Sequence, residues 1–285
     1  MLFYAWGAPK FVFVVVLSTI VDYYLVRYLA KQDNPNKRKQ LLTLGIILNL
    51  GILVFFKYAN FFVENFNELL TGMGISQVGW TSIALPIGIS FYVFQSISYA
   101  VDVYRKEEPP LDRLTDYMLY IFSFPQLIAG PIVRFGTVSK EIRHREEKID
   151  DKLIGFYRFS IGLAKKAILS NLMAEQSEYI FNSDFSQLPL GTAWFGAIAY
   201  TFHIYFDFSG YSDMAIGLGK MMGFHFPENF NTPYVSRSIT EFWRRWHMTL
   251  GNFMRDYLYI PLGGNRSSNN WKTCLLYTSP SPRDA

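Results

Sequence analysis

Polar side chains inside long apolar segments are the groups in this sequence whose types and spacing could do chemistry, because charge within such segments is costly. The first group is His203 with Asp207, whose i,i+4 spacing places both side chains on one helix face. A carboxylate there could fix the tautomer of the imidazole and raise its basicity. A buried pair that satisfies its own hydrogen bonds between helices explains the spacing equally well. No third ligand follows at a suitable spacing, so we predict no metal site.

A second group lies in an aromatic stretch that ends in a histidine. Glu241 and Arg245 are spaced i,i+4, and so are Trp243 and His247. A continuous helix would therefore stack an indole beside the imidazole. Desolvation lowers the pKa of histidine and keeps it neutral, which a proton acceptor requires. The alternative is an aromatic-belt helix with a structural histidine, and spacing alone favours that alternative.

Two further groups combine helix-breaking residues with polar side chains. Ser123–Arg134 contains two prolines and a glycine that would break a helix at membrane depth, so Gln126 and Arg134 could face a cavity. Asp256–Arg266 contains a Gly-Gly pair that permits a tight turn, and Arg255 and Arg266 could hold the phosphates of a cofactor. The alternatives are a kinked helix end and an ordinary helix stop.

The elements that must position these groups are membrane helices. The chain has 285 residues, of which 50% are hydrophobic and 18% charged, below the roughly 25% charged residues of soluble domains. Its net charge of +4 is modest and forms no stripe suited to nucleic acid. A bilayer core requires about 20 mostly apolar residues per helix. Five segments have that character: Phe11–Leu29, Leu41–Tyr58, Ser82–Tyr104, Leu153–Leu172 and Thr192–Met222.

Three segments depart from simple spans. Thr192–Met222 is too long for one span, and its glycines predict a break or a tilt. Leu114–Ile132 is predicted to be re-entrant or tilted, which is tolerated only inside protein or beside a cavity. Met248–Leu262 is amphipathic and is predicted to lie within or under the bundle. The predicted fold class is therefore all-α, a polytopic transmembrane helical bundle with re-entrant and amphipathic helices.

The charges of the loops predict an orientation. Asp33–Lys39 and Val133–Lys152 are rich in Lys and Arg, whereas Phe61–Trp80 and Met173–Gly191 contain neither. Basic loops remain on the cytoplasmic side. The N-terminus is therefore predicted to lie outside, and the region around Arg237–Arg245 inside.

The last residues do not match the rest of the chain. Cys274–Ala285 has no hydrophobic period and resembles a translated sequencing adapter, although an ordinary disordered tail would also have this composition. We predict one integral domain over residues 1–271 and a non-native read-through tail over 272–285. The single cysteine excludes an intrachain disulfide.

Five stretches taken together resemble the membrane-bound O-acyltransferase family, and within it the bacterial alginate O-acetyltransferase-like branch. The resemblance extends to about Trp271 and identifies His247 as a site residue. The stretches are Pro125–Arg134, Tyr205–Gly217, Phe230–Tyr234, Phe242–His247 and Arg255–Arg266.

The resemblance implies helices around a thin central region, with a tunnel that joins a cytoplasmic donor side to an outer acceptor side. Family members move an acyl group from a thioester to a hydroxyl and carry two active-site histidines. One matches His247; the principal one belongs to a Trp-His-Gly type motif that this chain lacks, so the chain as given is expected to be inactive. Supporting or tunnel positions are expected at His203, Asp207, Gln126, Arg134, Trp243, Trp246 and Arg255.

The resemblance also implies a reaction and a place for it. The acyl group, expected to be acetyl, would come from acetyl-CoA or an acylated carrier protein, with no tightly bound cofactor. It would pass to an extracytoplasmic polysaccharide such as alginate, directly or through periplasmic acetyltransferase partners, at the bacterial inner membrane. One alternative is D-alanyl transfer to teichoic acid, but the stretch Pro261–Arg266 favours the acetyl-transferring branch. The other alternative is a transporter, which would predict an internal repeat that we do not find.

Overall fold

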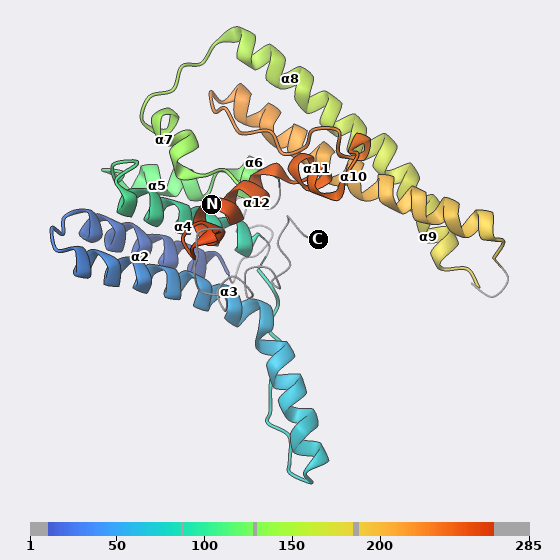
Figure 1. Ribbon diagram of the computed structural model, residues 1–285, viewed down its shortest axis with the longest axis horizontal. Helices are drawn as coiled ribbons and strands as arrows, with labels where there is room; N and C mark the ends of the chain where they lie inside the picture. The colour runs from blue at the N-terminus through green and yellow to red at the C-terminus, as the bar shows by residue number, and fades with distance from the viewer. Residues whose placement is uncertain (1–10, 87, 128–129, 185–187, 265–285) are drawn as a thin grey trace. The chain divides into compact units, whose positions relative to one another are not determined.

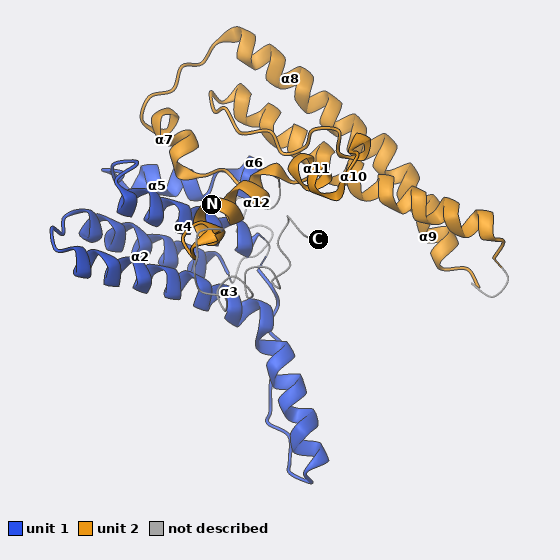
Figure 2. Ribbon diagram, viewed as in Figure 1, with its two compact units in different colours: residues 1–128 blue, residues 129–285 orange. Residues whose placement is uncertain are grey.

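The computed structural model describes residues 11–86, 88–127, 130–184 and 188–264. Within these ranges every regular element is a helix (Figure 1). The all-α prediction is therefore confirmed for the described part of the chain. The chain forms two compact units, unit 1 over residues 1–128 and unit 2 over residues 129–285 (Figure 2).

Unit 1 is built on three helices that pack against one another. Asn34 begins the second helix, since its side chain accepts a hydrogen bond from the Asn36 amide at 2.9 Å and Pro35 occupies the first turn. Arg38 is buried and donates to the carbonyl of Leu29 at 3.3 Å and to that of Tyr104 at 2.7 Å, which ties the three helices together. The helices of unit 1 are α2 (Val12–Ala30), α3 (Pro35–Gly72), α4 (Ile89–Arg105), α5 (Leu114–Ile121) and α6 (Phe124–Leu127).

Two of the described helices, α2 and α3, are long and apolar enough to cross a membrane. Large apolar side chains such as Phe13 and Phe62 are exposed on them, as expected for surfaces that face lipid. Of the other three predicted spans, Leu153–Leu172 and Thr192–Met222 lie in helices, whereas Ser82–Tyr104 is helical only from Ile89 onward. Their crossing of the membrane remains a prediction. The predicted loop Phe61–Trp80 is wrong in its first part, because α3 continues to Gly72. Its 38 residues extend roughly 57 Å, more than a bilayer core requires.

The segment predicted to be re-entrant is interrupted within its described part. Helix α5 ends at Ile121, and α6 begins at Phe124 with Pro125 in its first turn. Proline cannot continue a preceding helix, which accounts for the interruption. The expected break is confirmed, whereas the re-entrant path through a membrane stays a prediction.

Unit 2 contains a long helical hairpin followed by short helices. Helix α8 runs without interruption through a π-helical turn, η1, into α9, and all three pack along α10 (Figure 1). The predicted loop Met173–Gly191 is wrong in its first half, since α9 extends to Phe181. The helices of unit 2 are α7 (Phe135–Arg143), α8 (Ile149–Ala164), η1 (Lys165–Ser170), α9 (Asn171–Phe181), α10 (Leu190–Met221), η2 (Pro233–Val235), α11 (Ile239–Arg245), α12 (Met248–Phe253) and η3 (Met254–Tyr259).

Helix α10 is unbroken over 32 residues, so the break predicted at its glycines is wrong. The glycines serve close packing instead. A Cβ atom on Gly210 would lie 2.8 Å from the carbonyl oxygen of Gly162, and one on Gly217 would lie 2.6 Å from that of Gly155. Helices α8 and α10 therefore meet backbone against backbone, as small residues permit in membrane proteins.

The predicted read-through tail and the Asn265–Arg266 end of the Gly-Gly-Asn-Arg stretch that precedes it lie outside the described residues. The predicted domain boundary at residue 271 falls there too.

Candidate functional site

His247 lies in a sharp turn between two short helices. Helix α11 ends at Arg245, Trp246 is extended, and α12 begins at Met248. The prediction of one helix that stacks Trp243 on His247 is therefore wrong. The backbone of His247 is left-handed, with φ 44° and ψ 50°, which costs on the order of 1–3 kcal/mol for a residue other than glycine and is typical of functional sites.

The loop before η2 holds this turn in place through its backbone. The Asn231 amide donates to the carbonyl of Arg245 at 2.9 Å, and the Met248 amide donates to the carbonyl of Asn229 at 2.9 Å. These two bonds bracket His247, so its imidazole is placed against the side chain of Asn229.

The imidazole of His247 is packed between an amide and an aromatic ring. Its Nδ1 lies 2.9 Å from Asn229 Oδ1, and its centroid lies 4.8 Å from that of Phe208 in an edge arrangement at 77°. Burial lowers the pKa of His247 from 6.5 to about 4. The ring is therefore neutral at pH 7, as a proton acceptor must be.

Asn229 is fully buried and joins three segments of unit 2. Its Nδ2 donates to Ser212 Oγ at 3.0 Å, and its Oδ1 accepts from the hydroxyl of Thr249 at 2.8 Å. Thr249 Oγ1 in turn accepts from the amide of Ile132 at 2.9 Å. Sequence analysis missed Asn229 and Thr249, although Asn229 directly precedes the Phe230–Tyr234 motif.

Aromatic rings surround the turn on one side. Trp246 lies 5.1 Å from Phe230 and 5.6 Å from Phe242, measured between centroids, and it also contacts Tyr205 and Tyr234. Trp246 thus packs in this aromatic cluster, and its supporting role remains a prediction. Trp243 contacts Phe242 instead, at 5.4 Å.

Charged residues of α11 organise the start of that helix. The predicted i,i+4 pair is present, with the Arg245 guanidinium 2.9 Å from Glu241 Oε1. Ser238 caps the helix by accepting from the Glu241 amide at 3.1 Å, and Glu241 accepts from the Arg237 amide at 3.0 Å, an arrangement like a capping box. The Arg237 amide and the Arg245 guanidinium together lower the pKa of Glu241.

Arg134 and Arg255 meet at one carboxylate. Arg134 donates to Asp256 Oδ2 at 2.7 Å and lies 5.5 Å over the ring of Tyr257, while Arg255 donates to Asp256 Oδ1 at 2.7 Å. Both predicted guanidinium groups therefore lie at η3. Gln126 belongs to unit 1, where its Nε2 donates to the Tyr120 carbonyl at 3.0 Å.

His203 and Asp207 share a face of α10 as predicted, but each meets the π-helical turn. His203 Nδ1 lies 3.1 Å from the carbonyl oxygen and 3.0 Å from the hydroxyl of Ser170. Asp207 forms an ion pair with Lys166. The carboxylate therefore does not orient the imidazole, because the Ser170 carbonyl occupies the position on Nδ1.

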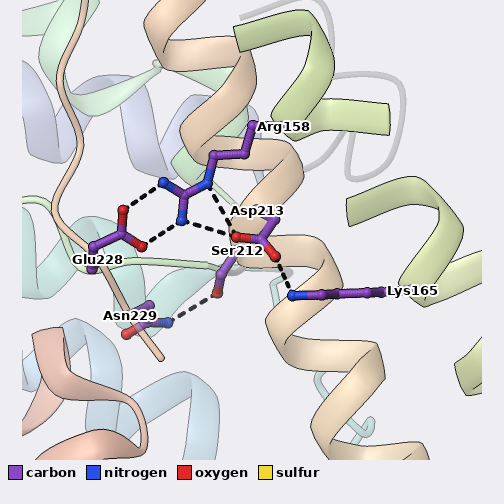
Figure 3. A network of polar contacts seen from close by, with 6 residues as sticks. All are labelled: Arg158, Lys165, Ser212, Asp213, Glu228 and Asn229. Carbon is purple, nitrogen blue, oxygen red and sulfur yellow. Dashed lines mark hydrogen bonds and ion pairs between the residues drawn. The ribbon is translucent and has the colours of Figure 1, made fainter. Parts of the chain in front are cut away.

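An ion network that the sequence analysis missed lies beside Asn229 (Figure 3). The guanidinium of Arg158 bridges Glu228 and Asp213, and Lys165 Nζ lies 2.6 Å from Asp213 Oδ2. Glu228 precedes Asn229 and Asp213 follows Ser212 in the chain. Charged residues inside predicted spans were the available signal, but only packing shows that they pair.

The described residues contain no group of three or more His, Cys, Asp or Glu side chains that could hold a metal ion. The chemistry that this part of the chain offers is a neutral imidazole at a strained, aromatic-lined turn.

Comparison with known proteins identifies relatives over most of the chain. The model of the membrane-bound O-acyltransferase family matches residues 36–277. The probable alginate O-acetylase AlgI of Pseudomonas aeruginosa is 47% identical over 267 residues, which cover 93% of this chain and 51% of that protein. The peptidoglycan O-acetyltransferase of Helicobacter pylori is 37% identical over 292 residues, which cover 93% and 54%.

A more distant relative is the teichoic acid D-alanyltransferase of Bacillus subtilis, 35% identical over 187 residues that cover 61% of this chain and 45% of that protein. The chain thus spans about half the length of the curated relatives that it matches.

Proposed function

The chain belongs to the membrane-bound O-acyltransferase family, and from that premise we propose that the protein transfers an acetyl group from a thioester donor to a hydroxyl of a polysaccharide. The observation that carries the proposal is the imidazole of His247, held neutral by burial on a strained turn inside a family motif. Two relatives whose names state O-acetylation of alginate or peptidoglycan support the choice of acetyl and polysaccharide.

The proposed reaction is a direct acyl transfer. The hydroxyl oxygen of the acceptor attacks the thioester carbonyl carbon, the carbon–sulfur bond breaks, and the hydroxyl proton passes to an imidazole and then to the departing sulfur. General-base assistance of this kind is worth about 10²–10⁴ in rate. His247 positions the acceptor or assists, and the histidine of a Trp-His-Gly type motif, which this chain does not contain, would be the principal base.

We propose acetyl-CoA or an acylated carrier protein as the donor, reached from the cytoplasm. The Lys and Arg residues of segment 133–152 and the guanidinium groups at η3 support an acidic donor on that side. The acceptor would be an extracytoplasmic polysaccharide such as alginate, acetylated directly or through periplasmic acetyltransferase partners. The protein would be a multi-pass protein of the bacterial inner membrane with its N-terminus outside, as the alternation of basic loops supports.

The experiment is complementation of a strain that lacks the gene, using the complete gene product. Ester-linked acetate on the exopolysaccharide is measured for wild type, His247→Ala and His144→Ala, with protein amounts checked on a blot. His144 is an exposed histidine outside the site and serves as the control. We expect His247→Ala to lose acetate and His144→Ala to retain it. Unchanged acetate in His247→Ala at equal protein amount would contradict the proposed role.

D-alanyl transfer to teichoic acid is the second candidate, supported by the D-alanyltransferase of B. subtilis. The same strains distinguish it, because ester-linked D-alanine rather than acetate would then depend on the gene.

A further inference from the structure

We infer that Asn229 is a positioning residue that holds His247 in the tautomer with the proton on Nδ1, so that Nε2 is the nitrogen through which His247 assists acyl transfer, by accepting a hydrogen bond or a proton from the hydroxyl of the acceptor. The tautomer follows from hydrogen-bond geometry alone. Its catalytic meaning rests on the proposed function.

The backbone amide of Ile132 determines which groups donate and which accept in the hydrogen bonds from Thr249 to Asn229. A backbone amide can only donate, so Thr249 Oγ1 accepts from Ile132 N at 2.9 Å. The hydroxyl proton of Thr249 is then available for Asn229 Oδ1 at 2.8 Å, and the Thr249 amide points to the same oxygen at 3.4 Å. Two donors therefore converge on Asn229 Oδ1, which identifies that atom as the amide oxygen.

The hydrogen bond of Asn229 Nδ2 supports the same assignment of the amide oxygen and nitrogen. Its Nδ2 donates to Ser212 Oγ at 3.0 Å, as Figure 3 shows. Asn229, Ser212 and Thr249 are 0%, 2% and 4% exposed, so water has little access to these bonds. The ion network of Arg158 lies beside both ends, because Glu228 and Asp213 adjoin Asn229 and Ser212 in the chain (Figure 3).

The orientation of the Asn229 amide determines which nitrogen of the His247 imidazole carries the proton. His247 Nδ1 lies 2.9 Å from Asn229 Oδ1, and two acceptors do not form a hydrogen bond, so Nδ1 must carry the proton. A neutral imidazole has only one N–H, which leaves a lone pair on Nε2. Among the described residues Nε2 forms no hydrogen bond, and the left-handed turn keeps the ring against Phe208.

An amide suits this position better than a carboxylate. When Nε2 takes the hydroxyl proton of the acceptor, the imidazolium keeps Nδ1–H on a neutral oxygen and readily returns the proton to the sulfur as the carbon–sulfur bond breaks. A carboxylate in place of Asn229 would stabilise the imidazolium and raise the pKa of His247. Asn229→Asp therefore keeps the tautomer but changes the pH dependence, whereas Asn229→Ala removes the constraint.

The first experiment is nitrogen NMR on the complete gene product with ¹⁵N-labelled histidine, reconstituted in lipid. His247→Gln identifies the signal of His247, and couplings to the ring protons show which nitrogen is protonated. We expect Nδ1–H in wild type, in Thr249→Ser and in Asn229→Asp. We expect Nε2–H to become populated in Asn229→Ala and in Thr249→Val, where the amide can turn over. A proton on Nε2 in the wild type would overturn the inference while leaving the proposed function standing.

The second experiment is acetyl-transfer kinetics on the same variants. Asn229→Ala and Thr249→Val should lower kcat about 10- to 100-fold, up to the lower end of the roughly 10²–10⁴ that general-base assistance contributes, with KM for the donor little changed. Thr249→Ser should restore wild-type kcat. In Asn229→Asp the acid limb of the pH profile should move to higher pH, which a purely packing role would not produce.

The outcomes distinguish the positioning role of Asn229 from the proposed role of His247 in acyl transfer. Wild-type kcat in a variant whose tautomer has changed would overturn the positioning role. Full activity of His247→Ala would remove the proposed role of His247 but not the NMR result. Should Asn229→Ala fail to accumulate, Thr249→Val carries the test, because valine is close to threonine in size and shape and replaces the hydroxyl by a methyl group.

Discussion

Two histidines of unit 2 use the same nitrogen in different surroundings. His203 Nδ1 meets the carbonyl of Ser170 on the π-helical turn, and His247 Nδ1 meets the amide oxygen of Asn229. His203 lies in the regular helix α10 one turn from the Lys166–Asp207 ion pair, whereas His247 lies on a left-handed turn among neutral and aromatic groups. The two histidines therefore use the same ring nitrogen in sites that are not equivalent.

The difference lies in what surrounds each ring. The contacts of His203 join α10 to η1, beside a helix pair that is already held by glycines and ion pairs. The contacts of His247 restrain a strained turn and, within the part of the chain that the structure describes, leave Nε2 without a hydrogen bond. We therefore interpret the first histidine as part of the helix contact and the second as the candidate for chemistry.

The sharpest test of this comparison substitutes each histidine in turn. His247→Ala should lower acetyl transfer by at least about 100-fold, the lower end of general-base assistance, whereas His203→Ala should retain activity within about 10-fold at equal protein amount. Transfer by detergent-solubilised, complete protein is measured with radiolabelled acetyl donor. Equal losses in the two variants would contradict the distinction.

A second test loosens the helix pair that carries His203. In Gly162→Val a Cβ atom would begin 2.6 Å from the carbonyl oxygen of Gly210, so α8 and α10 must separate. We expect a loss of about 1–3 kcal/mol or more in the free energy of unfolding, measured by thermal unfolding in detergent. Gly51→Ala is the control, since nothing lies within 4 Å of its Cβ atom. A wild-type melting temperature for Gly162→Val would refute the close contact.

A third test uses pH to detect the buried ring of His247. Its pKa is lowered from 6.5 to about 4 by burial, so between these values the unfolded chain binds more protons than the folded one. The free energy of unfolding should therefore be highest above pH 6.5 and fall as the pH decreases toward 4, by up to about 3 kcal/mol. His247→Gln should remove this part of the slope. Identical pH dependence in the two proteins would show that the ring is not buried.

The smallest effect is expected at the ion pair beside His203. Lys166 and Asp207 are 43% and 39% exposed, and pairs of that exposure contribute about 0–1 kcal/mol. Lys166→Met should therefore change the free energy of unfolding by less than about 1 kcal/mol and leave acetyl transfer unchanged. A loss of transfer would instead assign the pair a part in the reaction.

Much of the helical framework could be predicted from local sequence. Helix α2 and the core of α3 follow from apolar length, and the interruption near Pro125 follows from proline chemistry. His247 was singled out through an ordered set of motifs. The roles assigned to it and to the neighbouring candidates remain predictions.

The errors have a common cause. A break was predicted in α10 because only the backbone flexibility of its glycines was considered. In the structure these glycines instead allow α8 to pack closely against α10. The stretch from Glu241 to His247 predicted one helix, but the loop around Asn229 binds the backbone on both sides of His247 and holds a turn there. In both cases a distant segment overrides local preference.

The sequence by itself determined most of the helical segments, which side chains are costly to bury, and which family the ordered motifs resemble, because these depend on neighbours within a few turns. Only the tertiary structure decided that Asn229 meets His247, 18 residues away, and that Ile132 meets Thr249, 117 residues away. Periodicity shows which face of a helix a residue occupies. It does not show which loop will pack against that face, because that choice depends on the close contact of helices far apart in the chain.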